Sequence, residues 1–259
     1  MSWRISPLGD RALVAELAAG AADESWVQVG AAAQWLRQAK VPWMIDLIPA
    51  YTTVTIVYDP VRVWQALASN NGMTIYEKAS KTVEELLAST AVGLRQVVEH
   101  IHVPVCYGGE YGPDLEESAE RSGVSADAFV EVHSSAEYTV ALVGFVPGFP
   151  YLAGLPPQLA QPRRVNPRAR VPAGTVAIGG GQTGIYPLEV PGGWQLIGRT
   201  PLRLFDAARP EPALLRAGDR IRFFPISEEQ FRTMEAEVAG NAGDRSREKT
   251  RTGRIVSER

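Results

Sequence analysis

Four arginines within eight positions are the side chains of this sequence best suited to bind an anion. They lie in residues 162–174, which read Pro-Arg-Arg-Val-Asn-Pro-Arg-Ala-Arg-Val-Pro-Ala-Gly. The planar guanidinium group matches the geometry of carboxylates and phosphates. We expect Arg168 and Arg170 to bind substrate or phosphate, because neighbouring prolines restrict the backbone there. Arg163 and Arg164 are expected to belong to a solvated loop with surface ion pairs.

A glycine run offers a second contact for an anion. Residues 179–187 read Gly-Gly-Gly-Gln-Thr-Gly-Ile-Tyr-Pro, and glycines let backbone N–H groups approach a phosphate or an oxyanion. We expect Gln182 to orient the reacting group in catalysis, and Thr183 and Tyr186 to bind substrate or phosphate. The run is not a Walker A loop, because the Gly-Lys-Ser/Thr ending is absent.

Residues 191–201, Pro-Gly-Gly-Trp-Gln-Leu-Ile-Gly-Arg-Thr-Pro, place an indole, a carboxamide and a guanidinium between glycine turns. Gln195 and Arg199 are four residues apart in an extended segment, where side chains alternate between two faces. We therefore expect both to point into one pocket, with Gln195 orienting the substrate and Arg199 binding its charge. Trp194 is expected to line the pocket, although tryptophan is more often part of a core.

Aromatic side chains in residues 144–154, Gly-Phe-Val-Pro-Gly-Phe-Pro-Tyr-Leu-Ala-Gly, supply the other expected pocket walls. Three glycines and two prolines fix the turns of this segment, so that Phe145, Phe149 and Tyr151 are held in place before a ligand arrives. The alternative interpretation is a set of tight barrel corners in which the aromatic rings pack only against one another.

One of the three histidines is placed for acid–base chemistry. His133 lies between a predicted helix and a predicted strand, and we expect it to transfer protons, the alternative being a structural histidine at a helix end. His100 and His102 share one face of a strand, but two ligands without a third do not make a metal site. We expect no structural metal, and an inert buried thiol at Cys106.

Residues 1–95 predict a small α/β domain. Strands are expected where alternating or β-branched residues are bounded by turns, and helices where apolar residues recur every three or four positions. The predicted strands span 3–7, 12–17, 43–48 and 51–58, and the predicted helices span 24–39, 61–69 and 81–94. The order resembles a split βαβ domain of ferredoxin-like type with helices on one face.

Residues 96–239 predict a second, mainly β domain, which makes the whole chain an α+β protein. Short helices are expected at 113–122 and 125–132, with Asp114 and Ser125 marking their starts, and a last helix at 227–239. The strands between them are short and separated by Gly and Pro turns, which indicates a barrel or a sandwich. They span 138–143, 174–178, 186–190 and 220–224, and a polar, mobile tail is expected at 240–259.

Charge and composition exclude several classes of protein. The formal net charge is −3, with six basic and three acidic side chains in residues 241–259, so that this tail is at +3 and residues 1–240 are at −6. An acidic body does not predict nucleic-acid binding. A single cysteine excludes an internal disulfide and fits the cytoplasm. The sequence shows no secretion signal and no run of about 18 apolar residues, so neither export nor membrane insertion is expected.

Five motifs in a fixed order carry a resemblance to a known family. The first is Val-Pro-Val-Cys-Tyr-Gly-Gly-Glu-Tyr-Gly-Pro-Asp-Leu, and the set lies at 103–115, 144–152, 171–178, 182–187 and 191–201. It closely resembles the family of the 5-oxoprolinase B subunit, which also carries the names KipI and allophanate hydrolase subunit 1 and matches half of the urea carboxylase carboxyltransferase domain. The resemblance covers about residues 5–230. It implies a cyclophilin-like β-barrel for the second domain.

The resemblance also implies a reaction and partners. Together with the A subunit of 5-oxoprolinase and its C subunit, which has a related barrel fold, ATP would drive conversion of 5-oxo-L-proline to L-glutamate, with Mg²⁺ accompanying the nucleotide. Two alternatives stay open: an inhibitor that binds a sensor histidine kinase, as KipI does, and a carboxyltransferase-related half acting on urea-derived carboxylates or allophanate. The sequence leaves open which polypeptide binds ATP, whether the chain self-associates, and whether Glu110 or Glu189 takes part.

Overall fold

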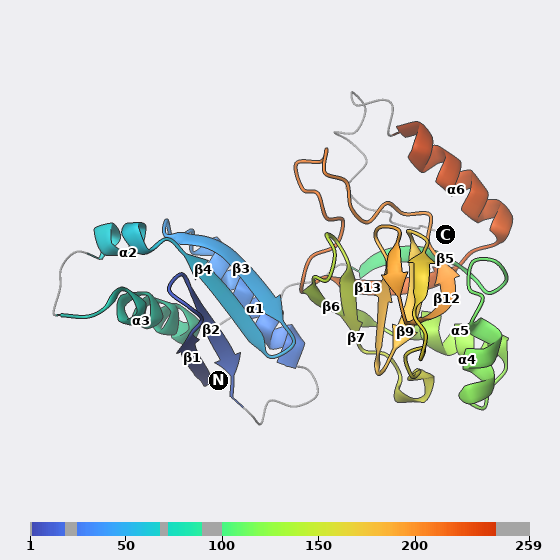
Figure 1. Cartoon of the computed structure of the whole chain (residues 1–259), viewed down its shortest axis with the longest axis horizontal. Coiled ribbons are helices and arrows are strands. Elements are labelled where there is room, and N and C mark those ends of the chain that lie inside the picture. Colours follow the sequence, from blue (N-terminus) through green and yellow to red (C-terminus); the bar gives the residue numbers. More distant parts are fainter. Residues whose placement is uncertain (1, 19–24, 68–71, 90–99, 242–259) are drawn as a thin grey trace. The chain divides into compact units, whose positions relative to one another are not determined.

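The structure, a computed structural model, describes residues 2–18, 25–67, 72–89 and 100–241 (Figure 1). The chain divides into two compact units, Met1–Val97 and Val98–Arg259, and each has a hydrophobic core of its own. The boundary predicted at residue 95 and nearly all of the predicted tail lie outside the described residues.

The N-terminal unit is a four-stranded antiparallel sheet with helices. Its elements are β1 (Trp3–Pro7), β2 (Ala12–Leu17), α1 (Ser25–Gln38), β3 (Met44–Ala50), β4 (Thr53–Tyr58), α2 (Pro60–Ala66) and α3 (Ile75–Ala88). Every second residue of β2 and β4 is buried, so these strands have one face in the core, as an antiparallel sheet with one covered face requires. Leu36 of α1 and Val83 of α3 pack into that core.

The predicted ferredoxin-like arrangement is not confirmed. The strand order is β1-β2-β4-β3, with β4 antiparallel to both β2 and β3. A ferredoxin-like domain adds a strand after its second helix, whereas here the strand beside β2 is β1, the first of the chain. The predicted helix 81–94 begins earlier, at Ile75, because Thr74 and Glu77 form a reciprocal capping box.

The C-terminal unit contains a closed barrel of seven strands, which confirms the predicted β-barrel. Around the barrel the order is β10-β7-β6-β13-β5-β12-β9, and β10 pairs with β9 to close it. Only β13 and β5 run parallel among the paired strands of this barrel. The strands are β5 (His100–Tyr107), β6 (Tyr138–Val143), β7 (Pro150–Ala153), β9 (Thr175–Gly179), β10 (Gln182–Ile185), β12 (Gln195–Arg199) and β13 (Arg220–Pro225).

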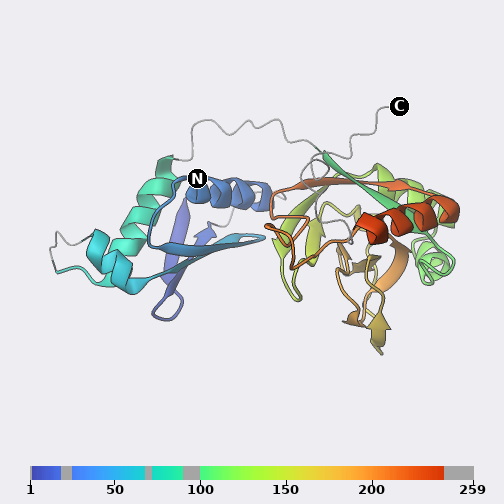
Figure 2. The same cartoon turned by 90° about the horizontal axis from the view of Figure 1, so that it is seen from above.

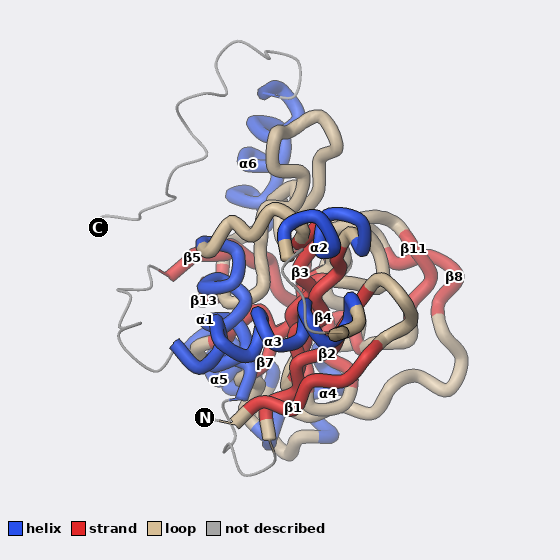
Figure 3. The backbone as a smooth tube through the Cα atoms, turned by 90° about the vertical axis from the view of Figure 1, so that its left-hand side faces the viewer, coloured by secondary structure: helices blue, strands red, loops and turns tan. Residues whose placement is uncertain are grey.

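In the described part of this unit, two further strands and three helices lie around the barrel. The strands β8 (Arg168–Val171) and β11 (Val190–Gly192) form a separate antiparallel ribbon, seen at the edge of the unit in Figure 3. The strand predicted at 186–190 is wrong, because Tyr186–Glu189 form the turn between β10 and β11. The helices are α4 (Leu115–Arg121), α5 (Ala126–Ser135) and α6 (Glu228–Asn241), and η2 (Pro157–Leu159) is a 3₁₀ turn.

The last helix lies at the β5 side of the barrel (Figures 1 and 2). Its start is fixed by Ser227, which exchanges hydrogen bonds with Gln230 in the manner of a capping box. The predicted helix at 227–239 is therefore present, and its start coincides with a capping pattern in the sequence.

Candidate functional site

The predicted pocket walls form a packed aromatic cluster on the outer face of the barrel. On β9, Val176 and Ile178 point into the barrel core, so Ala177 between them points outward. The cluster on that outer side consists of Phe149, Val171, Ala177, Tyr186, Trp194 and Leu196, with Tyr151 at its margin. The Phe149 ring lies 4.7 Å from Tyr151, 5.2 Å from Tyr186 and 5.7 Å from Trp194, measured between ring centroids.

Phe145 differs from the other predicted walls because two-thirds of its surface is exposed. Its φ of 69° places a non-glycine residue in the left-handed region, and its ring meets Phe149 edge-on at 5.9 Å. The aromatic cluster is thus closed in its interior and presents Phe145 to solvent. Burial raises the pKa of the Tyr186 hydroxyl above its ordinary value.

The glycine run packs against aromatic rings at both ends and is open between them. A side chain at Gly179 would meet the Trp194 indole at 2.6 Å, and one at Gly184 would meet the Phe149 ring at 3.0 Å. Glycine is needed at both places because a Cβ there would come too close to a ring. A Cβ at Gly181 would have no heavy atom within 4 Å, so this part of the run faces open space.

Asp114 is the centre of the arginine cluster, and sequence reasoning gave it only a capping role. Its carboxylate makes no cap bond to α4. Instead it accepts two hydrogen bonds from Arg168, at 2.8 and 2.6 Å, and one from Arg164 at 3.3 Å. The backbone N–H of Leu196 donates to it at 2.7 Å. Asp114 is 4% exposed, so the predicted anion-binding group Arg168 is already paired with a buried carboxylate of the protein itself.

Gln195 is also engaged inside the protein. Its Nε2 donates to the Pro162 carbonyl at 2.8 Å, and the residue is 2% exposed. Within the described residues its Oε1 has no hydrogen-bond partner. Gln195 pairs with the inward-facing Ile178, whereas Gln182 pairs with Gly179 on the outer side. The two glutamines therefore point to opposite faces of the sheet.

The expectation that Gln195 and Arg199 share a face is wrong. A register shift between Leu196 and Gly198 marks a β-bulge in β12. One extra residue reverses the alternation of side chains, so that Arg199 pairs with Thr175 on the outer side. A strict period of two cannot detect such a bulge.

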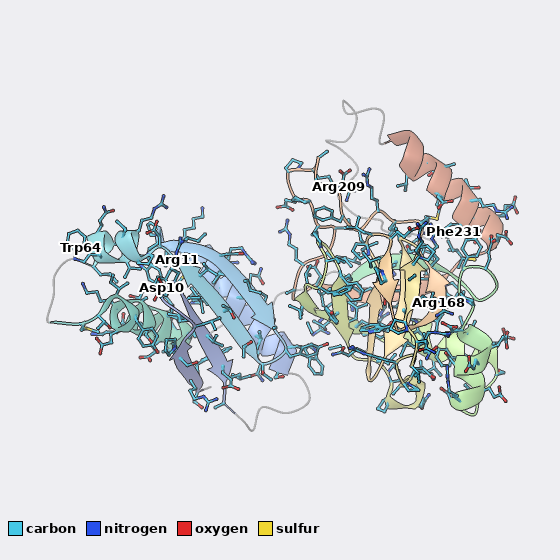
Figure 4. The ribbon with its side chains drawn as sticks, in the orientation of Figure 1. Asp10, Arg11, Trp64, Arg168, Arg209 and Phe231 are labelled. Atoms are coloured by element: carbon cyan, nitrogen blue, oxygen red, sulfur yellow. The ribbon has the colours of Figure 1, made fainter. Side chains whose placement is uncertain are left out.

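Arg199 contacts the last helix instead. Its Nε donates to the Ala173 carbonyl at 2.8 Å, its Nη2 lies 3.6 Å from Glu235, and its guanidinium carbon lies 5.7 Å from the centre of the Phe231 ring. Figure 4 shows Phe231 and Arg168 at separate places of the barrel unit. Arg170 is different again, because its side chain is 82% exposed and lies 3.8 Å from Glu189.

The structure places His133 in the barrel core, where the side chain cannot reach a substrate to transfer a proton. The side chain is fully buried, with Nδ1 2.9 Å from the Tyr107 hydroxyl and Nε2 3.2 Å from the Thr183 hydroxyl. Both ring nitrogens are occupied by the protein, and Thr183 in turn donates to the Ala177 carbonyl. Burial lowers the pKa of His133 to about 3, so the ring stays neutral. The structural alternative fits His133, and Thr183 is fully buried beside it.

The predicted residues therefore fall into separate groups and do not form one pocket. The groups are the core pair His133 and Thr183, Arg168 with Asp114, Gln195 with the Pro162 carbonyl, the aromatic cluster, Arg170 near Glu189, and Arg199 beside α6. A cavity of about 150 Å³ lies elsewhere, in the N-terminal unit between α1 and β3. It is lined by Leu36, Arg37, Lys40, Val41, Met44, Ile45, Asp46 and Leu47.

Neither a metal-binding cluster nor a membrane-spanning helix occurs in the described residues. They contain no group of three or more His, Cys, Asp and Glu side chains arranged to hold a metal ion. In the same part of the chain, no helix combines the length and the apolar character needed to cross a membrane.

Known proteins resemble this chain over most of its length. A family model described as carboxyltransferase domain, subdomain C and D, matches residues 3–215. The 5-oxoprolinase B subunit of Bacillus subtilis (strain 168) is 40% identical over 235 residues, which is 91% of this chain and 98% of that protein. The B subunit of Escherichia coli O157:H7 is 45% identical over 221 residues, 85% of this chain and 95% of that protein.

A solved structure agrees with the fold. The crystal structure of TTHA0988 superposes with a TM-score of 0.68 at 36% identity, and the match covers 84% of this chain and 40% of that chain. The kinase-inhibitor and urea-carboxylase interpretations are not favoured by the curated relatives. Because the family model covers most of the chain and both curated relatives align over nearly their whole length, the chain belongs to the carboxyltransferase-domain family and, within it, to the group of 5-oxoprolinase B subunits.

Proposed function

We propose that this chain is the B subunit of an ATP-dependent 5-oxoprolinase, which converts 5-oxo-L-proline, ATP and water to L-glutamate, ADP and phosphate. The observation that carries the proposal is the match to the 5-oxoprolinase B subunit across 98% of the Bacillus subtilis protein. A match of this extent leaves no separate domain of that relative unaccounted for.

The chemistry explains why such an enzyme needs ATP. The five-membered lactam is a poor electrophile, because resonance stabilises its amide bond. Phosphorylating the lactam oxygen makes the ring carbon more electrophilic and creates a good leaving group. An enzyme that does this holds the substrate carboxylate and the nucleotide phosphates close together, which requires fixed cationic groups.

The arrangement of the polar groups supports completion of the site by partner polypeptides. Arg168 is committed to Asp114, and His133 is sealed in the core. Neither is free to act on a substrate in this conformation. We propose that the A and C subunits supply the missing acid–base and phosphate-binding groups. The chain of TTHA0988, of which only 40% matches this chain, offers one example of a relative with additional polypeptide.

The outer face of the barrel is the surface that we assign to the shared site. It carries the exposed Phe145 and the partly buried Tyr151. The exposed Arg170 lies on the adjoining β8–β11 ribbon. Arg163 lies over the Trp194 ring, 5.7 Å from its centroid, and adds a second cation. Aromatic and arginine side chains are the residue types most enriched at protein interfaces.

We assign ATP, with its Mg²⁺, to a partner or to the seam between the subunits. The sequence lacks a Walker A motif, and the end of the glycine run at Gly179 is filled by the Trp194 indole. The cytoplasm is the proposed compartment, because the only cysteine of the chain is a free thiol.

Release of ADP that depends on 5-oxoproline tests this proposal. The chain would be assayed alone, with the C subunit, with the A subunit, and with both, at equal protein concentration and with and without 5-oxoproline. We expect turnover only in the complete mixture, because no single polypeptide holds the whole site.

Two results would reject the proposal. Lactam-dependent ADP release by this chain alone would show that the site is complete without partners. No release from the complete mixture, with all three polypeptides shown to be folded by circular dichroism, would remove the 5-oxoprolinase assignment.

A further inference from the structure

The outer side of strands β5 and β12 carries a cysteine and an arginine next to each other. Arg199 pairs directly with Cys106 across these antiparallel strands, so both side chains lie on one face. Val103 and Val105 of β5 point into the barrel core, and Cys106 therefore points outward. Yet Cys106 is only 6% exposed, so another element must cover this outer face.

Helix α6 is that element, and its attachment is narrow. Of its side chains from Glu228 to Val238, only Phe231 is buried, at 1% exposure. The Phe231 ring packs 4.5 Å from the Tyr111 ring and beneath the Arg199 guanidinium. The rest of this stretch is exposed or half-buried. One aromatic side chain thus anchors the helix.

Apart from a hydrogen bond between the Arg232 and Tyr111 side chains, the polar contacts of α6 with the barrel are loose. Arg199 and Glu235 are 3.6 Å apart, with the Glu235 side chain 51% exposed, and Arg232 is 3.9 Å from Glu110 with both about two-thirds exposed. Exposed pairs at these distances contribute little to stability. The guanidinium of Arg199, in contrast, is fixed by its hydrogen bond to the Ala173 carbonyl.

We propose that α6 is a detachable cover over a carboxylate-binding surface centred on Arg199, where Glu235 stands in for the carboxylate of a ligand. When α6 leaves, the fixed guanidinium presents its Nη groups and the Tyr111 ring is uncovered beside it. The match to the carboxyltransferase-domain family model ends at residue 215, before β13 and α6 begin, whereas the match to the Bacillus subtilis B subunit spans 235 residues and extends into α6.

The surrounding charges favour a carboxylate over a phosphate. Glu110 and Glu228 lie near the thiol of Cys106, where burial raises the thiol pKa and these two carboxylates raise it further. The acidic neighbours repel a dianion more strongly than a monoanion. One arginine among them suits a single carboxylate group, which can bind the guanidinium in bidentate fashion.

Labelling of Cys106 by a thiol reagent tests the cover, because this cysteine is the only one in the chain. Phe231→Ala removes the anchor, and we expect the labelling rate to rise at least about tenfold. Glu235→Gln removes only the loose ion pair, and a rise of roughly twofold is expected. Thr233→Ala is the matched control, since this exposed residue on the same helix bonds to the Glu229 carbonyl of its own helix; its rate should equal that of the wild type.

The carboxylate site has its own test in the full chain. By calorimetry, the monocarboxylate propionate should bind Phe231→Ala more tightly than the wild type, and adding Arg199→Gln to Phe231→Ala should weaken binding at least about tenfold. Inorganic phosphate should bind Phe231→Ala more weakly than propionate. Equal propionate binding with and without Arg199, or tighter phosphate binding, would overturn the site.

Hydrogen exchange of the wild-type chain covers the case in which Phe231→Ala does not fold. The backbone amides of α6 should exchange at least about tenfold faster than those of β5 and β12. Protection of α6 equal to that of the barrel strands, or an unchanged Cys106 labelling rate in folded Phe231→Ala, would overturn the cover. None of these measurements requires 5-oxoprolinase activity, so they succeed or fail independently of the proposed function.

Discussion

At the scale of single residues, the buried carboxylate of Asp114 pairs with Arg164 and Arg168, so these arginines bind an anion of the protein itself. Asp114 is 54 residues from Arg168 and 82 from Leu196 in the sequence, and all three meet only in the folded barrel. Sequence reasoning recognised the anion affinity of the arginines, but it could not tell that the anion belongs to the protein itself. From the sequence, Asp114 is predicted only to mark the start of a helix.

Replacing Asp114 should therefore destabilise the fold. Asp114→Asn leaves Arg168 without its charged partner, and we expect the free energy of unfolding to fall by about 2–4 kcal/mol. This is somewhat less than for a fully buried ion pair, because Arg168 is partly exposed. Chemical denaturation followed by circular dichroism measures this. Glu117→Gln, which breaks only an exposed pair with Arg121, should change stability by less than about 0.5 kcal/mol. Equal effects of the two substitutions would contradict the role of Asp114.

His133 should make stability depend on pH in the acid range. In the folded chain its pKa is lowered to about 3 by burial, while the unperturbed value is 6.5. Below pH 6.5 the unfolded chain takes up a proton that the folded chain does not. The contribution of His133 is therefore complete above pH 6.5, and it falls by up to about 1.4 kcal/mol per pH unit down to about pH 3.

A comparison with His133→Gln isolates this effect, because the amide does not titrate and retains a donor and an acceptor for Tyr107 and Thr183. Denaturation curves at pH 7, 6 and 5 should converge as the pH falls, with the wild type losing its advantage. Parallel pH profiles for the two chains would show that His133 is not the buried neutral group described here.

At the scale of elements, periodicity predicted most strands and helices but missed the local exceptions. The strands at 3–7 and 12–17 are as expected, because alternation records which face is buried. The β-bulge in β12 and the turn at Tyr186–Glu189 depend on contacts with neighbouring strands, which a sequence window does not contain. The single pocket expected from Gln195 and Arg199 failed for this reason.

The glycine run gives an element-scale prediction with its own control. A methyl group at Gly179 would clash with the Trp194 indole, whereas one at Gly181 would meet nothing within 4 Å. Gly179→Ala should lower the free energy of unfolding by about 1–3 kcal/mol, and Gly181→Ala should change it by less than about 0.5 kcal/mol. If both substitutions were neutral in urea denaturation, the close packing of the indole on β9 would be wrong.

At the scale of the whole molecule, the two units and the barrel class were predictable, while the site was not. A change from alternating strands and helices to closely spaced strands indicated a second domain, and the ordered motifs indicated the family. The candidate functional groups, however, are distributed over the barrel and largely satisfied by one another. The sequence of this chain predicts the fold better than the site, because the proposed reaction also depends on residues of partner chains.

The formation of L-glutamate from 5-oxo-L-proline tests the central claim most directly, since it follows the broken lactam bond itself. In the mixture of this chain with the A and C subunits, we predict about one glutamate for each ADP released, and none when this chain or ATP is omitted. Glutamate formation that is undiminished when this chain is omitted would contradict the account, as would its absence from the complete mixture.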